Sequence, residues 1–230
     1  MHWHRRVPFV LIAAGMLCAS ILAAATTTSA ADWWMSCFSE LGATNDTSSM
    51  LFNGGVVLAG LVITLSALPI LRGLRGAYAA GSRAGSADST LMPLLIAGLG
   101  ISLVLIGVLP LSFDVFAHER AANGALASSA GLLLLHRRHL RGLSRTLDRI
   151  ALGAVVVLAL GMAGLIAGLL TLTVFEALAF GSVITWLHAV ETLTRRIPNA
   201  PAATSAAFPA NSQQIILSPI WGTRASGVTV

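Results

Sequence analysis

The stretch His136-Arg-Arg-His-Leu-Arg-Gly-Leu-Ser-Arg-Thr-Leu-Asp-Arg149 places five arginines between two long apolar runs. Apolar runs long enough to cross a membrane as helices occur six times in the chain, and arginine is concentrated in every second gap. The six runs cover residues 7–31, 50–71, 91–111, 117–135, 149–171 and 174–194. Because cytoplasmic connections are enriched in Lys and Arg, each arginine-rich gap is predicted to face the cytoplasm.

The other arginines follow the same alternation. They precede the first run (Arg5, Arg6), separate the second from the third (Arg72, Arg75, Arg83) and follow the sixth (Arg195, Arg196). The remaining gaps carry mainly Asp and Glu and are predicted to face outward. The sequence therefore predicts an all-α fold, an integral membrane bundle of six transmembrane helices over residues 1–196, with both termini cytoplasmic.

Composition and charge agree with a membrane protein. Apolar residues make up 56% of the chain and charged residues 10%, far from the balance of a soluble domain. The net charge of +5 does not indicate nucleic acid, because the arginines lie along one predicted membrane face without interleaved aromatic residues. Anionic lipid headgroups are the predicted partners, and the candidate contacts are Arg137, Arg138, Arg141 and Arg145. A purely topological role of these arginines is the alternative.

The first apolar run has two interpretations. Its basic start and the small residues Ser29-Ala30-Ala31 resemble a cleaved secretory signal. The run is, however, longer than the central region of a signal and long enough to span a membrane, which favours a retained first helix. Trp33 and Trp34 then follow at the depth expected of an aromatic belt.

Two further features bear on packing and order. Gly164 and Gly168 have the small-residue spacing that lets membrane helices approach closely, within the bundle or between copies of the chain. After Arg196 the chain becomes rich in Pro, Ala, Ser and Thr, so residues 197–230 are predicted to be a disordered cytoplasmic tail.

Polar residues that interrupt apolar runs are the candidates for function. Glu40, Asn53, Asp114, His118 and Glu176 are far apart in sequence but share one predicted depth at the outer face. They form either one outward-facing ligand pocket or ordinary solvated loops and helix ends. At the inner end, Glu191 follows His188 by three positions and precedes Arg195 by four, which predicts pairing on one helix face.

Several short motifs resemble those of the prokaryotic membrane family known as domain of unknown function 998. They are Ser39-Glu-Leu-Gly42, Phe52-Asn-Gly54, Gly107-Val-Leu-Pro110, His118 and Phe175-Glu176, and the resemblance covers roughly residues 9–194. It implies a six-helix fold in a bacterial cell membrane, with an extracytoplasmic polar cluster and no established activity.

Two classes of function follow. The first is a non-enzymatic membrane protein that binds or moves a lipid or small amphiphile, or acts as a subunit beside an unknown membrane partner. The second is a membrane-embedded enzyme acting on an extracytoplasmic lipid headgroup. No metal or cofactor is predicted: His118 is the only outer imidazole, and a helix rise of 1.5 Å per residue puts His136 about 27 Å away from it.

Overall fold

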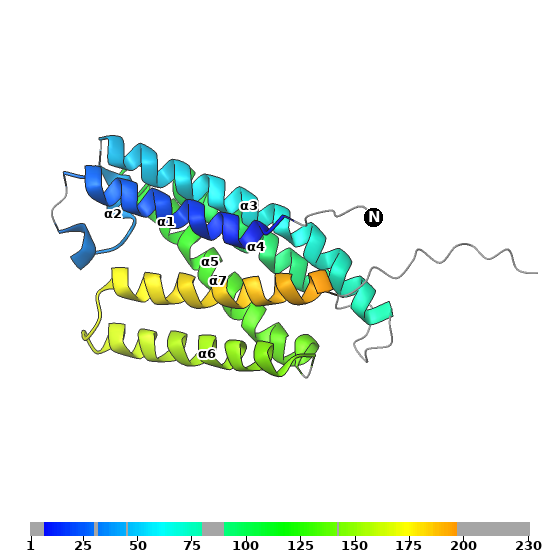
Figure 1. Cartoon of the computed structure of the whole chain (residues 1–230). Coiled ribbons are helices and arrows are strands. Elements are labelled where there is room, and N and C mark those ends of the chain that lie inside the picture. The colour runs from blue at the N-terminus through cyan, green and yellow to red at the C-terminus, as the bar shows by residue number, and fades with distance from the viewer. Residues whose placement is uncertain (1–6, 30–31, 45, 80–89, 142, 197–230) are drawn as a thin grey trace, which may run out of the picture. The chain divides into compact units, whose positions relative to one another are not determined.

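A computed structural model of the chain describes residues 7–29, 32–44, 46–79, 90–141 and 143–196. These residues form helices joined by turns, and no strand occurs among them (Figure 1). The predicted all-α fold is therefore confirmed for this part of the chain. The predicted tail at 197–230 lies outside the described residues, as do Arg5, Arg6 and Arg83.

Six long helices and three short ones make up the described bundle. The long helices are α1 (Phe9–Thr27), α3 (Thr47–Ala79), α4 (Leu91–Val108), α5 (Val115–Leu135), α6 (Arg145–Ile166) and α7 (Leu172–Arg196). The short ones are the 3-10 turn η1 (Trp33–Met35), the single turn α2 (Glu40–Ala43) and the π-helical turn η3 (His136–Leu140).

Five of the long helices have the length and apolar composition needed to cross a membrane: α1, α3 over Thr47–Arg75, α4, α6 and α7. The chain is thus a multi-pass membrane protein by its helices. The predicted span at 117–135 coincides with α5, which is a helix of 21 residues but is not among these five. Charged and small polar residues such as Glu119, Arg120 and Ser128 reduce its apolar character.

Helix neighbours in space follow the chain only in part. α3 packs along both α1 and α4, α4 packs along α5, and α7 contacts α1 and α3. Figure 1 shows α6 lying along α7, at the edge of the bundle. The last helix thus lies against the first and third, which connects the beginning and end of the described bundle.

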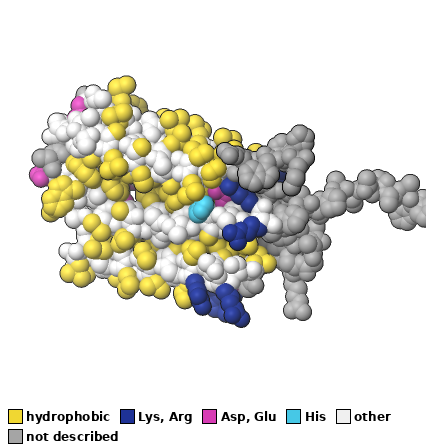
Figure 2. All heavy atoms as spheres, viewed as in Figure 1, with side chains coloured by type: hydrophobic (Ala, Val, Ile, Leu, Met, Phe, Trp, Pro, Cys, Tyr) yellow, Lys and Arg dark blue, Asp and Glu magenta, His cyan; other side chains and the backbone are white. Residues whose placement is uncertain are grey.

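Because successive long helices run in opposite directions, arginines and acidic residues are concentrated at opposite ends of the bundle. The end of α3, the turn η3 with the start of α6, and the end of α7 lie together and carry most of the arginines; we call this the arginine end. The starts of α3, α5 and α7, together with η1 and α2, lie at the other end, the acid end. Figure 2 shows arginines gathered at one end and acidic side chains at the other, as well as beside the arginines.

Gly164 and Gly168, which were expected to let two helices approach closely, lie at the end of α6 instead. Gly168 follows the end of α6 and has a φ of +69°, the left-handed conformation that glycine adopts at helix ends. A Cβ on Gly164 would meet Leu170 of the same turn, at 2.9 Å. The pair therefore lies at the end of α6 and packs no second helix of the described bundle, so the prediction of packing within the bundle was wrong. A contact between copies of the chain stays a prediction. The close approach lies between Gly60 of α3 and Gly100 of α4, where a Cβ on either would come within 2.6 Å of the other's carbonyl oxygen.

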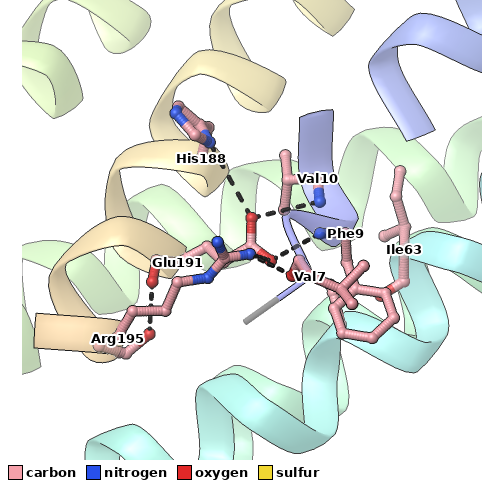
Figure 3. A network of polar contacts seen from close by, with 9 residues as sticks. Val7, Phe9, Val10, Ile63, His188, Glu191 and Arg195 are labelled. Atoms are coloured by element: carbon pink, nitrogen blue, oxygen red, sulfur yellow. Dashed lines mark hydrogen bonds and ion pairs between the residues drawn. The ribbon is translucent and has the colours of Figure 1, made fainter. Parts of the chain in front are cut away.

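A buried carboxylate fixes the start of α1 (Figure 3). Glu191 of α7 is 1% exposed, and its two oxygens accept hydrogen bonds from the backbone N–H groups of Phe9, at 2.9 Å, and Val10, at 3.2 Å. The first N–H groups of a helix have no partner within it, and the residue before α1 supplies no side-chain cap. Glu191 therefore caps α1 from a helix about 180 residues later in the chain.

Arg195 and His188 complete this arrangement. Arg195 donates to Glu191 at 2.5 Å and also to the carbonyl of Val7, and the imidazole of His188 lies 3.9 Å from the carboxylate. The predicted pairing of Glu191 with Arg195 is confirmed, and His188 lies near the same carboxylate without a hydrogen bond from its Nδ1. The helix dipole of α1 and the guanidinium together compensate a charge that would be costly to bury alone.

Candidate functional site

At the acid end, residues 36–44 run across the bundle between α1 and α3, and we call them segment 36–44. Three of the five predicted site residues bind this segment, each from a different long helix. Asn53 of α3 donates to the carbonyl of Gly42 at 3.0 Å, and Glu176 of α7 accepts from the backbone N–H of Phe38 at 2.8 Å. His118 of α5 lies 2.8 Å from the hydroxyl of Ser39. The segment is thus held by α3, α5 and α7 together.

The hydrogen bonds of His118 define its tautomer. Its Nδ1 lies 2.8 Å from the carbonyl oxygen of Leu109, which only accepts, so Nδ1 carries the hydrogen and donates. In the neutral imidazole, Nε2 accepts from the Ser39 hydroxyl. Through these two contacts the imidazole joins segment 36–44 to the end of α4. It is 5% exposed, so the connection lies within the protein.

The other two predicted site residues lie apart from this arrangement. Asp114 is the N-cap of α5 and accepts from the backbone N–H of Ala117 at 3.0 Å. Glu40 belongs to α2 and accepts from the hydroxyl of Ser36 at 3.4 Å. The structure therefore brings Asn53, His118 and Glu176 onto one segment, and gives Asp114 and Glu40 local roles.

Sequence reasoning missed Asp46, the residue with the most side-chain hydrogen bonds at this end. Its Oδ1 accepts from the backbone N–H of Ser48 at 2.9 Å and from the hydroxyls of Ser48 and Thr44, which caps α3. Its Oδ2 accepts from the backbone N–H and hydroxyl of Ser29, just after α1. An Asp before Thr-Ser-Ser is a recognisable helix start, but the bond to Ser29 depends on the tertiary fold.

A cavity of about 240 Å³ adjoins segment 36–44. Phe38 and Ser39 of the segment line it, and its other walls come from α1, α3, α4, α5, α6 and α7. Most of the wall is apolar, for example Phe52, Leu103 and Phe175. Only four polar side chains line it: Ser39, Asn123, Ser129 and Glu176. We refer to this space as the outer cavity.

A second polar group lies at the arginine end. His136, which follows α5, donates from Nε2 to Asp148 of α6 at 3.1 Å, while its Nδ1 accepts from the indole N–H of Trp186 at 3.3 Å. Burial lowers the pKa of His136, against the opposing effect of Asp148. An accepting Nδ1 requires the neutral imidazole, so both contacts agree with that direction.

The four arginines predicted to contact lipid occupy different positions. Arg137 and Arg141 line a cavity between α5 and α6, whereas Arg138 and Arg145 do not. No three His, Cys, Asp or Glu side chains among the described residues come together as a metal site would require.

The hydrogen bonds of Asp46 predict a pH-dependent contribution to stability. Hydroxyl donors from Ser48 and Thr44 lower the pKa of Asp46 well below its usual range. The unfolded chain takes up this proton near the ordinary pKa of about 3.9, while the folded protein does not. The stability that Asp46 contributes is therefore fully present above about pH 5 and is lost as pH falls toward the folded pKa.

We expect Asp46→Ala to lower the free energy of unfolding in detergent at neutral pH, with the difference from the unsubstituted protein shrinking below about pH 4. Asp32→Ala, which removes an exposed acid outside this network, is the matched control and should leave the curve unchanged. A constant Asp46 difference across this range would contradict the assignment.

Comparison with known proteins identifies a family. Residues 11–192 match the model of a family described as protein of unknown function, DUF998. No curated protein and no solved structure matches the chain. The matched region runs from α1 to near the end of α7 and includes segment 36–44, His118 and Glu176. The chain therefore belongs to the DUF998 family.

Proposed function

We propose that this chain is a six-span membrane protein that binds the apolar part of a small amphiphile in the outer cavity. The observation that carries the proposal is the cavity itself: about 240 Å³, walled by apolar side chains and bordered by a few polar groups. Ligand sites of this kind are mostly apolar, with a small number of polar groups that orient the ligand. Its volume is below the usual range of about 300–1,000 Å³, which suits one narrow apolar group.

The polar groups indicate the chemistry of the ligand's other end. Glu176 uses one oxygen to accept from Phe38, and a carboxylate has further acceptor positions. The Ser39 hydroxyl and the Asn123 amide also line the cavity. We infer that the polar end of the ligand donates hydrogen bonds, as a hydroxyl or amine does.

Six spans and a cytoplasmic arginine end are part of this proposal. α5 has 21 residues, about 31 Å at 1.5 Å per residue, which matches a hydrocarbon core of about 30 Å. It runs from the acid end to the arginine end. His118, Ser128 and Ser129 are buried, whereas Glu119, Arg120 and Asn123 in its first half are exposed. A polar helix is tolerated in a membrane when its neighbours shield it from lipid. The positive-inside rule then places the arginine end, and both termini, in the cytoplasm of a bacterial cell.

Reporter fusions test the sixth span. A phosphatase reporter placed after Asp46 should be active outside, and a fluorescent reporter placed after Arg145 should be active in the cytoplasm, because α3, α4 and α5 make three crossings between them. Fusions that report the same side would mean that α5 does not cross.

A second candidate function, ester hydrolysis, is favoured by one contact. The Ser39 hydroxyl lies 2.8 Å from Nε2 of His118, the distance expected of a nucleophile and its base, and Leu109 orients the ring. Acyl transfer also needs donors for the developing oxyanion. The backbone N–H groups of Glu40, Leu41 and Gly42 donate instead to the carbonyls of Cys37, Phe38 and Ser39. Binding therefore has the stronger support.

A cavity-filling substitution tests the binding function. Ala179 lines the outer cavity, whereas Ala177 on the same helix does not and is exposed. Ala179→Phe should reduce binding of a fluorescent long-chain alcohol to the purified full chain by about tenfold or more, since it occupies the space of the chain. Ala177→Phe should leave binding unchanged.

Two outcomes would change the assignment. Equal binding by the Ala179→Phe and Ala177→Phe variants would contradict a ligand in the outer cavity. The same preparation should also be incubated with a long-chain ester. Hydrolysis that disappears in Ser39→Ala would favour the enzymatic candidate.

A further inference from the structure

A wide groove separates α5 from α6. α6 packs along α7 but makes no comparable contact with α5, and the turn η3 carries the chain from one helix to the other. The space between them is a cavity of about 730 Å³, about three times the outer cavity. Part of its wall is aliphatic, with Leu133 and Leu134 from α5 and Leu152 and Val155 from α6.

The mouth of this groove is charged. Arg137 and Arg141 line it at the arginine end, together with Asp148 and His136. Among the described residues, neither of these two guanidinium groups forms an ion pair. Asp148 accepts from the neutral His136, so the two arginines and one carboxylate leave the mouth with a net positive charge.

We propose that the α5–α6 groove binds an anionic phospholipid, with its phosphate between Arg137 and Arg141 and an acyl chain along Leu133, Leu152 and Val155. A single phosphodiester matches the net charge of the mouth, and guanidinium groups bind phosphate oxygens with a geometry suited to them. Its phosphate site is at the arginine end, whereas the outer cavity adjoins segment 36–44, and Leu158 lines both spaces. The proposal therefore goes beyond the amphiphile site.

The exposure of α6 supports a lipid occupant. Leu152 is 65% exposed and Val155 46% exposed, and both point into a space with no other part of the described chain. Inside a membrane, an aliphatic groove of this size fills with hydrocarbon. Arginines at the cytoplasmic face attract anionic headgroups, so the groove joins an acyl-chain surface to a phosphate site.

Charge substitutions test the phosphate site. The full chain, purified in a zwitterionic detergent, would be titrated with phosphatidylglycerol and phosphatidylcholine and examined by native mass spectrometry. We expect one phosphatidylglycerol per chain, and about tenfold or greater loss of its affinity in Arg137→Gln/Arg141→Gln. The matched control Arg72→Gln/Arg75→Gln removes the same charge at the end of α3, outside the groove, and should stay within about twofold of the unsubstituted protein.

A pair of adjacent valines tests the acyl-chain site. Val155 and Val156 are both 46% exposed, but only Val155 lines the groove. Val155→Trp should lower phosphatidylglycerol affinity about tenfold by filling the groove, with all arginines intact, and Val156→Trp should not.

Three results would overturn the proposal. Equal losses from the two arginine pairs would mean general attraction to the membrane surface, and equal binding of phosphatidylcholine would mean no phosphate site. A lipid-free dimer that Val155→Trp converts to monomer would assign the groove to a second copy of the chain. Ala179→Phe, which should reduce binding in the outer cavity, should leave phosphatidylglycerol affinity unchanged. Either proposal can therefore be contradicted while the other stands.

Discussion

The carboxylate of Glu191 is the constraint on which the bundle depends. It is buried at 1% exposure in an apolar protein, so it must be compensated by donors. The donors are the first N–H groups of α1 and the guanidinium of Arg195. α1 is therefore held against α7 at the arginine end. With α1 in this position, the chain leaves it at the acid end next to α3 and α7, where segment 36–44 is bound.

The acid end repeats the same principle, with side chains that pair backbone and hydroxyl groups of the chain's own turns. Asn53, His118 and Glu176 bind backbone or hydroxyl groups of segment 36–44, and Asp46 binds the turn after α1. In lipid, unpaired backbone groups cost several kcal/mol each, so irregular backbone at the end of a bundle needs such partners. These polar residues thus bind the chain's own connections, and only four polar side chains line the outer cavity. Apolar cavities with sparse polar borders suit amphiphiles and lipids better than water-soluble substrates.

The sequence predicts local features well and contacts between distant helices poorly. Runs of apolar residues located α1, α3, α4, α6 and α7, and the spacing of Glu191 and Arg195 predicted their pairing, because both depend only on helix geometry. Asn53, His118 and Glu176 each bind segment 36–44, which their shared predicted depth did not indicate. The cap from Glu191 to α1 and the contact of Gly60 with Gly100 depend on which helices are neighbours. The spacing of Gly164 and Gly168 did not predict a contact within the bundle, because the same spacing also occurs at a helix end.

The free energy of unfolding of Glu191→Gln, measured in detergent beside Glu119→Gln, tests this account most directly. The amide of Gln retains one acceptor but loses the charge that faces α1 and Arg195, so we expect a loss of about 2–4 kcal/mol. Amide hydrogen exchange at Phe9 and Val10 should become faster in the same variant. Glu119 is an exposed acid on α5, and its substitution should have little effect. Equal stability of the two variants, with unchanged exchange at Phe9 and Val10, would contradict the claim that Glu191 holds α1 in the bundle.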